Sequence, residues 1–484
     1  MKQNQIISVF KKRLIYLIIL NCVAFLLSGC ISATRSLGID LSSNKKQDRY
    51  FAQGKYEEAA KLATTDKDKD AKIDNDNLLP TLKAGNAYLF AKKYEESTLF
   101  LNEAEAIIKY QRDAIMLGDI ADYTTKLMLN DAALEFHATM TDSIMLNTYK
   151  ALALMFERRF SDTRVELNRA IDRQRRAKEV YAKLIKKQQQ LIQDKEKNKK
   201  NESGFATQFK KTLENPNTKK RIDTYYSNLK SFKAYPDFIN PFTVYLAGLY
   251  FGINGDYKKS VDLLKEASAM MPKNKIVSSD FRRIDAALSG RRVKNKYVWI
   301  FFENGLAPIK KEYKVNIPVF LLSSKVKYVG IALPVFQQRR MALPYLSVTT
   351  KREKNVHSQL IADMDRVILT EFKYEYNDIV TRAILSAALK TFSQYEAGRY
   401  GGGYVAMATG LFSALTTHAD TRTWTTLPKN FQVARVLMPK NHLVDLKLGS
   451  IHKKVYLAKN AKNSIVYVRM ATASSAPSIS VVNF

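Results

Sequence analysis

The stretch VYLAGLYFGINGDYKKSVDLLKEASAMMP, residues 244–272, has the spacing of two helices that pack together across a short turn. Gly248 falls on the expected first helix, where a small residue lets a second helix approach closely. Phe251 and Tyr257 are placed to fill the wedge between neighbouring helix pairs. Three smaller or apolar positions follow on the expected second helix: Ser260, Leu264 and Ala267.

The same offsets recur earlier in the chain. A good match is formed by Gly85, Tyr88, Tyr94, Ser97, Leu101 and Ala104, and a weaker one by Ala151, Leu154, Phe160, Thr163, Leu167 and Ala170. Gly85, Gly118 and Ala151 are each 33 residues apart, which places a degenerate unit near 118–140, and residues 51–59 look like the end of an earlier unit. The pattern resembles the tetratricopeptide repeat, with Pro272 as its closing proline. The resemblance implies an α-solenoid over residues 48–290.

A basic segment, residues 173–235, interrupts these repeats with 18 Lys or Arg against six Asp or Glu. Its narrow apolar stripe predicts a long helix, and Asn215-Pro216-Asn217 indicates a break before a return helix containing Ile222 and Tyr226. Two interpretations stay open: a helical hairpin that projects from the repeats, or a flexible solvated segment.

The composition changes after Gly290. Runs rich in aromatic and β-branched residues predict strands at 297–302, 315–321, 328–333, 432–437, 442–448, 454–457 and 465–470. A helical stretch is expected from Gln359 to Tyr395, followed by a turn at 401–403 and a helix at 404–417. We therefore expect an α+β protein in which residues 291–484 form a separate mixed strand and helix domain.

The N-terminus carries the most specific signal. Cations at positions 2 and 11–13 precede an apolar run that ends at Leu27-Ser28-Gly29-Cys30, which is typical of a secretory signal peptide over residues 1–29. These four residues resemble the bacterial lipobox, which implies cleavage before Cys30, lipidation of its sulfur and a lipidated linker over 30–47. Ile31, where the lipoprotein family has Asp for inner-membrane retention, favours the outer membrane. The alternative is an uncleaved anchor helix.

Charge and cysteine content narrow the classes of function. The mature chain would have no thiol, because Cys22 leaves with the signal peptide and Cys30 is acylated, so disulfides and cysteine nucleophiles are excluded. Its net charge falls from +32 to +28 on cleavage. Such a surface suits anionic envelope partners, whereas secretion argues against nucleic acid. The alternative is that scattered lysines only keep the protein soluble.

No catalytic or metal site emerges from the sequence. Residues 66–77 resemble an EF-hand loop, but Ala71 replaces the turn glycine and Asn77 the bidentate glutamate, so a polar loop is expected instead. Gly401–Gly403 lack a phosphate-loop ending, and His418 with Asp420 lack a nucleophile-elbow pattern. We therefore expect no enzyme, no cofactor and no metal.

Two segments look like fixed structural signatures: residues 303–312 (ENGLAPIKKE) and 420–428 (DTRTWTTLP). Both resemble segments of a poorly characterised bacterial lipoprotein family whose members are often encoded beside LpoB-type activators of penicillin-binding proteins. Gly305 and Pro308 suit a hairpin turn, and Trp424 with Leu427 suits a core plug.

These observations favour a membrane-anchored, non-enzymatic scaffold that faces the periplasm and offers a solenoid groove to an unidentified envelope protein. The groove's aromatic residues (Tyr88, Tyr94, Phe251 and Tyr257) are expected to be repeat core rather than ligand contacts. The alternative function is binding of anionic wall polymer or lipopolysaccharide by residues 173–235. A wall-modifying hydrolase is a third interpretation, for which no site is found.

Overall fold

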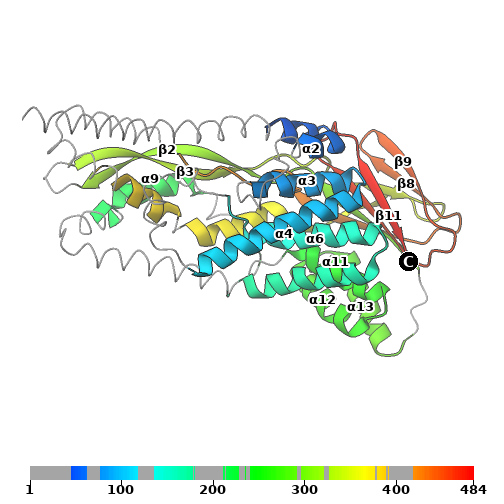
Figure 1. Ribbon diagram of the computed structural model, residues 1–484. Helices are drawn as coiled ribbons and strands as arrows, with labels where there is room; N and C mark the ends of the chain where they lie inside the picture. Colours follow the sequence, from blue (N-terminus) through cyan, green and yellow to red (C-terminus); the bar gives the residue numbers. More distant parts are fainter. Residues whose placement is uncertain are drawn as a thin grey trace, which may run out of the picture.

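The computed structural model mixes helices and sheets, which confirms the α+β class (Figure 1). It describes residues 45–62, 77–117, 136–177, 179, 211–212, 214–227, 235, 240–291, 296–320, 326–376, 379–388, 391 and 418–484.

Among the described residues, four helix pairs lie between residues 45 and 270. They are residues 45–52 with α2 (Tyr56–Leu62), α3 (Leu78–Phe90) with α4 (Tyr94–Leu117), α6 (Met140–Phe156) with residues 160–177, and α11 (Pro241–Ile253) with α12 (Tyr257–Met270). Helix α13 (Lys275–Leu288) follows. Several starts are capped by side chains: Thr139 and Asp142 form a capping box before α6, and Asn240 caps α11 ahead of Pro241.

The same tight turn joins each pair. One residue with positive φ lies two positions before each second helix: Gly54 (80°), Lys92 (63°), Arg158 (64°) and Gly255 (86°). The next N–H bonds back to the first helix, as Lys93 N does to Tyr88 O at 3.0 Å and Asp256 N to Phe251 O at 2.9 Å. Each second helix then begins with an aromatic residue. The four pairs are therefore built alike, although the turn residue varies.

A five-stranded sheet of order β11-β10-β1-β7-β6 covers these helices. The central strand β1 (Tyr297–Asn304) pairs parallel with β10 (Ser464–Met470) and antiparallel with β7 (Asn430–Leu437). The edges are β11 (Ser478–Asn483) and β6 (Gln359–Asp363). The expected helix start at Gln359 is wrong, because this segment pairs with β7 and the helix begins at residue 364.

Alternation along β1 creates three layers. Trp299 and Phe301 enter the core shared with the helices, whereas Val298, Ile300 and Phe302 enter a second core on the opposite face. A four-stranded sheet of order β5-β4-β8-β9 closes that second core. Its strands are Val356–His357, Ser347–Thr349, Leu443–Leu448 and Ile451–Tyr456.

A third, smaller core lies in an arm, which we define as β2 (Ile309–Phe320), β3 (Val326–Gln337), α9 (Pro216–Tyr225) and residues 379–388. In Figure 1 the β2–β3 hairpin extends to the left, away from β8 and β9. Residues 364–376 form a connecting helix: Met364 and Val367 belong to the helix–sheet core, and Leu369 and Phe372 to the arm core.

All the strands that the structure describes follow the predicted boundary near residue 290, but one core crosses it. Phe242 of α11 stacks on Phe431 of β7 with ring centroids 3.8 Å apart. The helices before residue 290 therefore share their core with the sheet, which buries their apolar surface.

The basic segment is described only in part. Asn215 caps α9 and Pro216 is at its first turn, where the sequence predicts the start of a return helix. Ile222 and Tyr226 of that predicted helix are buried in the arm core. The predicted signal peptide and Cys30, residues 66–76, the unit near 118–134 and residues 401–417 lie outside the described residues.

Candidate functional site

The glycines predicted to let helices approach are in close contact with the second helix. A Cβ at Gly85 would lie 2.7 Å from Leu101 Cγ, and one at Gly248 would lie 2.9 Å from Leu264 Cγ. The following serines donate to the same glycine carbonyls, Ser97 Oγ at 2.7 Å and Ser260 Oγ at 2.6 Å. These two helix pairs therefore share one packing scheme in detail.

The other predicted packing residues divide between core and surface. Ala104, Ala267, Phe251 and Tyr88 are buried. Tyr94 is partly buried and donates to Ser480 Oγ of β11 at 2.9 Å. Tyr257 is 36% exposed, and Pro272 is exposed after the end of α12.

The first helices of three pairs, α3, α6 and α11, lie under the sheet. Almost every residue of α3, α6 and α11 is buried. Tyr149 of α6 donates to Glu303 of β1 at 2.8 Å, and Phe242 of α11 stacks on Phe431 of β7. The face expected to offer a groove to a partner is therefore covered by the chain's own sheet.

A fully buried ion pair lies at the centre of this contact. Arg469 Nε of β10 is 3.2 Å from Glu303 Oε1, and both side chains are inaccessible to solvent. Tyr467 donates to the other Glu303 oxygen at 2.5 Å. Burial raises the pKa of Glu303, which Arg469 and the two tyrosine hydroxyls oppose. We call Glu303, Arg469, Tyr149 and Tyr467 the Glu303 cluster. It excludes water and offers no access to a substrate.

The two signature segments meet beside this cluster. Ala307 N donates to Leu427 O at 2.8 Å, and Arg469 donates to Thr426 O at 3.1 Å and to Gly305 O at 2.7 Å. Trp424 packs edge-on against Tyr149. Gly305 has φ of 69°, and a Cβ there would meet Met341 Cα at 2.8 Å. These segments thus hold the helices to the sheet.

Sequence reasoning missed Arg469. Its run, residues 465–470, predicts only a strand, and Glu303 is 166 residues away. The available signal is a lone charge inside an apolar run, once at Glu303 after Trp299–Phe302 and once at Arg469. A charge in a buried strand requires a partner, so two such strands indicate a pair.

A second buried acid links α11, α13, β1 and β7. Asp280 Oδ2 accepts from Tyr245 at 2.7 Å and from Trp299 Nε1 at 2.8 Å, while Arg435 pairs with the other oxygen. The carboxylate is saturated by structural donors, so it serves cohesion between layers.

A third buried acid joins the body, by which we mean the helix pairs and the two sheets of five and four strands, to the connecting helix. Glu371 accepts from the backbone N–H groups of Met140 (2.5 Å) and Thr141 (3.0 Å) at the start of α6. Burial, followed by the nearby Glu375 charge, raises the pKa of Glu371 to about 8. Burial likewise raises the pKa of Asp142, in the same turn, to about 6.

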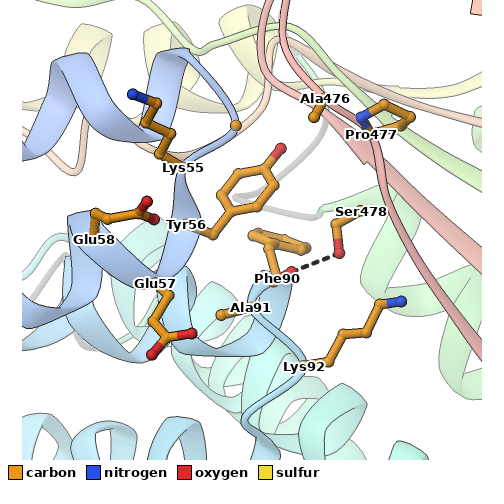
Figure 2. Close-up of a pocket in the computed structure, with 11 residues that line it drawn as sticks. Lys55, Tyr56, Glu57, Glu58, Phe90, Ala91, Lys92, Ala476, Pro477 and Ser478 are labelled. Atoms are coloured by element: carbon orange, nitrogen blue, oxygen red, sulfur yellow. Dashed lines mark hydrogen bonds between the residues drawn. The ribbon is translucent and has the colours of Figure 1, made fainter.

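A shallow hollow of about 360 Å³ lies where α2 and α3 meet the segment before β11 (Figure 2). Ser478 Oγ donates to Phe90 O at 2.6 Å across it, and Gly54 contacts Ala476 closely. Burial raises the pKa of the Tyr56 hydroxyl to about 12, so it stays protonated near neutrality. The geometry is that of a seam between two packed layers.

The outer surface of the helix pairs carries exposed apolar side chains. Leu99 of α4 is 66% exposed and borders a hollow of about 410 Å³ that Glu157 and Arg159 line from the next pair. Arg164 then pairs with Asp256 at 2.6 Å, beside Tyr257. We call these exposed residues of the second helices and their turns, with Val165 next to Arg164, the outer strip.

The histidines with described structure are not gathered into a site. His418 lies 3.3 Å from Glu312, Asp420 pairs with Arg422 at 2.9 Å, and His357 pairs with Ser347 across β4 and β5 at 2.8 Å. Among the described residues there is no group of three potential metal ligands, and no helix long and apolar enough to cross a membrane.

Comparison with known proteins adds no family: no family model and no curated protein matches this chain.

Proposed function

We propose that this chain is a lipid-anchored, non-enzymatic scaffold of the bacterial envelope that binds a protein partner through the outer strip of a tetratricopeptide-like stack. The equivalent turns and the shared Gly–Leu packing of its helix pairs support the repeat assignment. In this proposal Cys30 carries the lipid and holds the body at the periplasmic face of the outer membrane.

The choice of the outer strip as the binding surface rests on one observation. The first helices are buried under the sheet, whereas the second helices expose Leu99, Tyr110 and Val165. Apolar side chains at the centre of a charged rim are typical of protein interfaces. The outer strip combines Leu99 and Tyr257 with Glu157, Arg159, Arg164 and Asp256, so it fits a protein better than a uniformly anionic polymer.

The test is site-specific photo-crosslinking in intact cells, with the photoreactive residue placed at Leu99. We expect one dominant protein adduct that Val165→Arg reduces, because Val165 is exposed on the same strip. Tyr456 on β9, which is 73% exposed, is the matched control site. Equal adduct patterns at Leu99 and Tyr456 would refute the outer strip as the binding surface.

A further inference from the structure

The arm gathers tyrosines and cations from parts of the chain that are distant in sequence. Arg221 of α9 donates to Asn316 O of β2 at 3.1 Å, and its guanidinium lies 5.6 Å from the ring centre of Tyr328 on β3. One helical turn later, Tyr225 packs on Tyr313 of β2 with centroids 5.6 Å apart. These two contacts lie where α9 meets the β2–β3 pair, and we call their residues the arm seam.

The seam is exposed and cationic. Tyr328 is 64% exposed, and Tyr225 and Tyr313 are also open to solvent. Five cations on the flanking turns and strand are exposed: Lys219, Lys220, Arg221, Lys311 and Lys314. Glu312 is occupied by Ala419 N and His418, and lies 3.9 Å from Lys314. The five cations outnumber the nearby acids Glu214, Asp223 and Glu312, so the local field is positive and attracts anionic groups.

The packing of the rings distinguishes between anionic partners. Bases and sugars bind flat on an accessible ring face. Here Tyr225 and Tyr313 pack against each other at 46°, and Arg221 lies 5.6 Å from the ring centre of Tyr328, so each ring already has a neighbour in the chain. Exposed tyrosines beside lysines are typical of the headgroup level of a bilayer, where the rings insert and the lysines reach the phosphates.

We infer that the arm seam docks onto an anionic lipid surface, with phosphate headgroups bound by the flanking cations and the tyrosine rings inserted between them. This inference does not depend on the outer strip. Each Lys or Arg near an anionic leaflet contributes about 1 kcal/mol, so the removal of three charges weakens docking on the order of 100-fold.

The chain supplies a clean spectroscopic test. Its two tryptophans, Trp299 and Trp424, are buried, so a Tyr328→Trp variant adds one exposed reporter. The full-length lipidated protein is reconstituted into vesicles of brominated phosphatidylcholine, alone or with phosphatidylglycerol. We expect bromine quenching of the new tryptophan only with phosphatidylglycerol, and its loss in high salt because the Debye length falls to about 3 Å at 1 M.

A matched pair of triple variants separates the seam from overall charge. Lys219→Gln, Lys220→Gln and Lys314→Gln together should abolish quenching, whereas Lys453→Gln, Lys454→Gln and Lys459→Gln, exposed on and after β9, should retain it. Equal quenching in both vesicle types, or in neither, would overturn the inference. So would a shift of the reporter's emission by soluble polyphosphate without quenching by vesicles, which would indicate a polymer site. Leu99 crosslinks report on the outer strip separately.

Discussion

The body and the arm use charge in opposite ways. In the body, Arg469 lies over Phe51 and Phe90 and is enclosed with Glu303, with no contact to solvent. In the arm, Arg221 lies over Tyr328 in a comparable cation–aromatic contact but is exposed. The same residue type is thus buried between layers in one region and exposed on the surface in the other. In the body the arginine holds layers together, whereas in the arm it leaves a charge accessible to a ligand.

The largest expected effect comes from the Glu303 cluster. Arg469→Met leaves a buried carboxylate without its cation, which costs about 3–5 kcal/mol of unfolding free energy. Arg221→Met is the matched change in the arm and should cost no more than about 1 kcal/mol, as for exposed cation–π contacts. Urea unfolding followed by near-UV circular dichroism measures both.

A double variant sharpens this prediction. Glu303→Gln combined with Arg469→Met should be less destabilised than the sum of the single changes, because the pair is then removed together. Equal losses for Arg469→Met and Arg221→Met would show that the body does not depend on the buried pair.

The joint between body and arm should respond to pH. The folded-state pKa of Glu371, raised to about 8, lies above its unfolded value, so the folded protein binds the extra proton. Its contribution to stability is complete below the unfolded pKa and is lost as pH rises through about 8. At about 1.4 kcal/mol per pH unit, the unfolding free energy should fall by about 2 kcal/mol between about pH 5 and pH 6.5.

Two variants identify the group responsible. Glu371→Gln should reduce the slope of the urea midpoint against pH and leave the part due to Asp142, whereas Glu58→Gln, at an exposed carboxyl on α2, should leave the slope unchanged. An unaltered slope in Glu371→Gln would assign the pH dependence to other groups.

Local pattern was sufficient where the residues of an element themselves carry the signal. Gly85 and Gly248 marked helix pairs, and runs such as 297–302 and 465–470 marked strands, because burial on both faces requires apolar residues throughout. The sequence predicts a helix from Gln359, but pairing of residues 359–363 with β7, about 70 residues later, makes them a strand. The short edge strand β11, which follows Pro477, was missed although its partner β10 is close in sequence.

The arrangement of layers was beyond sequence reasoning. Whether α3, α6 and α11 face a partner or the chain's own sheet depends on contacts such as Phe242 with Phe431, 189 residues apart. Both outcomes demand the same apolar helix surface. Likewise, Arg221 and Tyr328 each resemble an ordinary surface residue, and only the fold unites them in the arm seam.

The smallest effect concerns two glycines. Gly85→Ala places a Cβ 2.7 Å from Leu101 Cγ, a branch point that cannot move without the α4 backbone. Overpacking of this kind costs about 1–3 kcal/mol, and the gain of about 1 kcal/mol in helix propensity offsets part of it. Gly330→Ala, in β3 of the arm, meets only Asn316 Oδ1 at 3.5 Å, an ordinary contact. We expect a loss of about 1–2 kcal/mol for the first and a change within about 0.5 kcal/mol for the second, from urea midpoints at constant slope. If Gly85→Ala cost as little as Gly330→Ala, the helix pairs would be as loosely packed as the arm surface. The contrast between a tightly packed body and an open arm would then lose its physical basis.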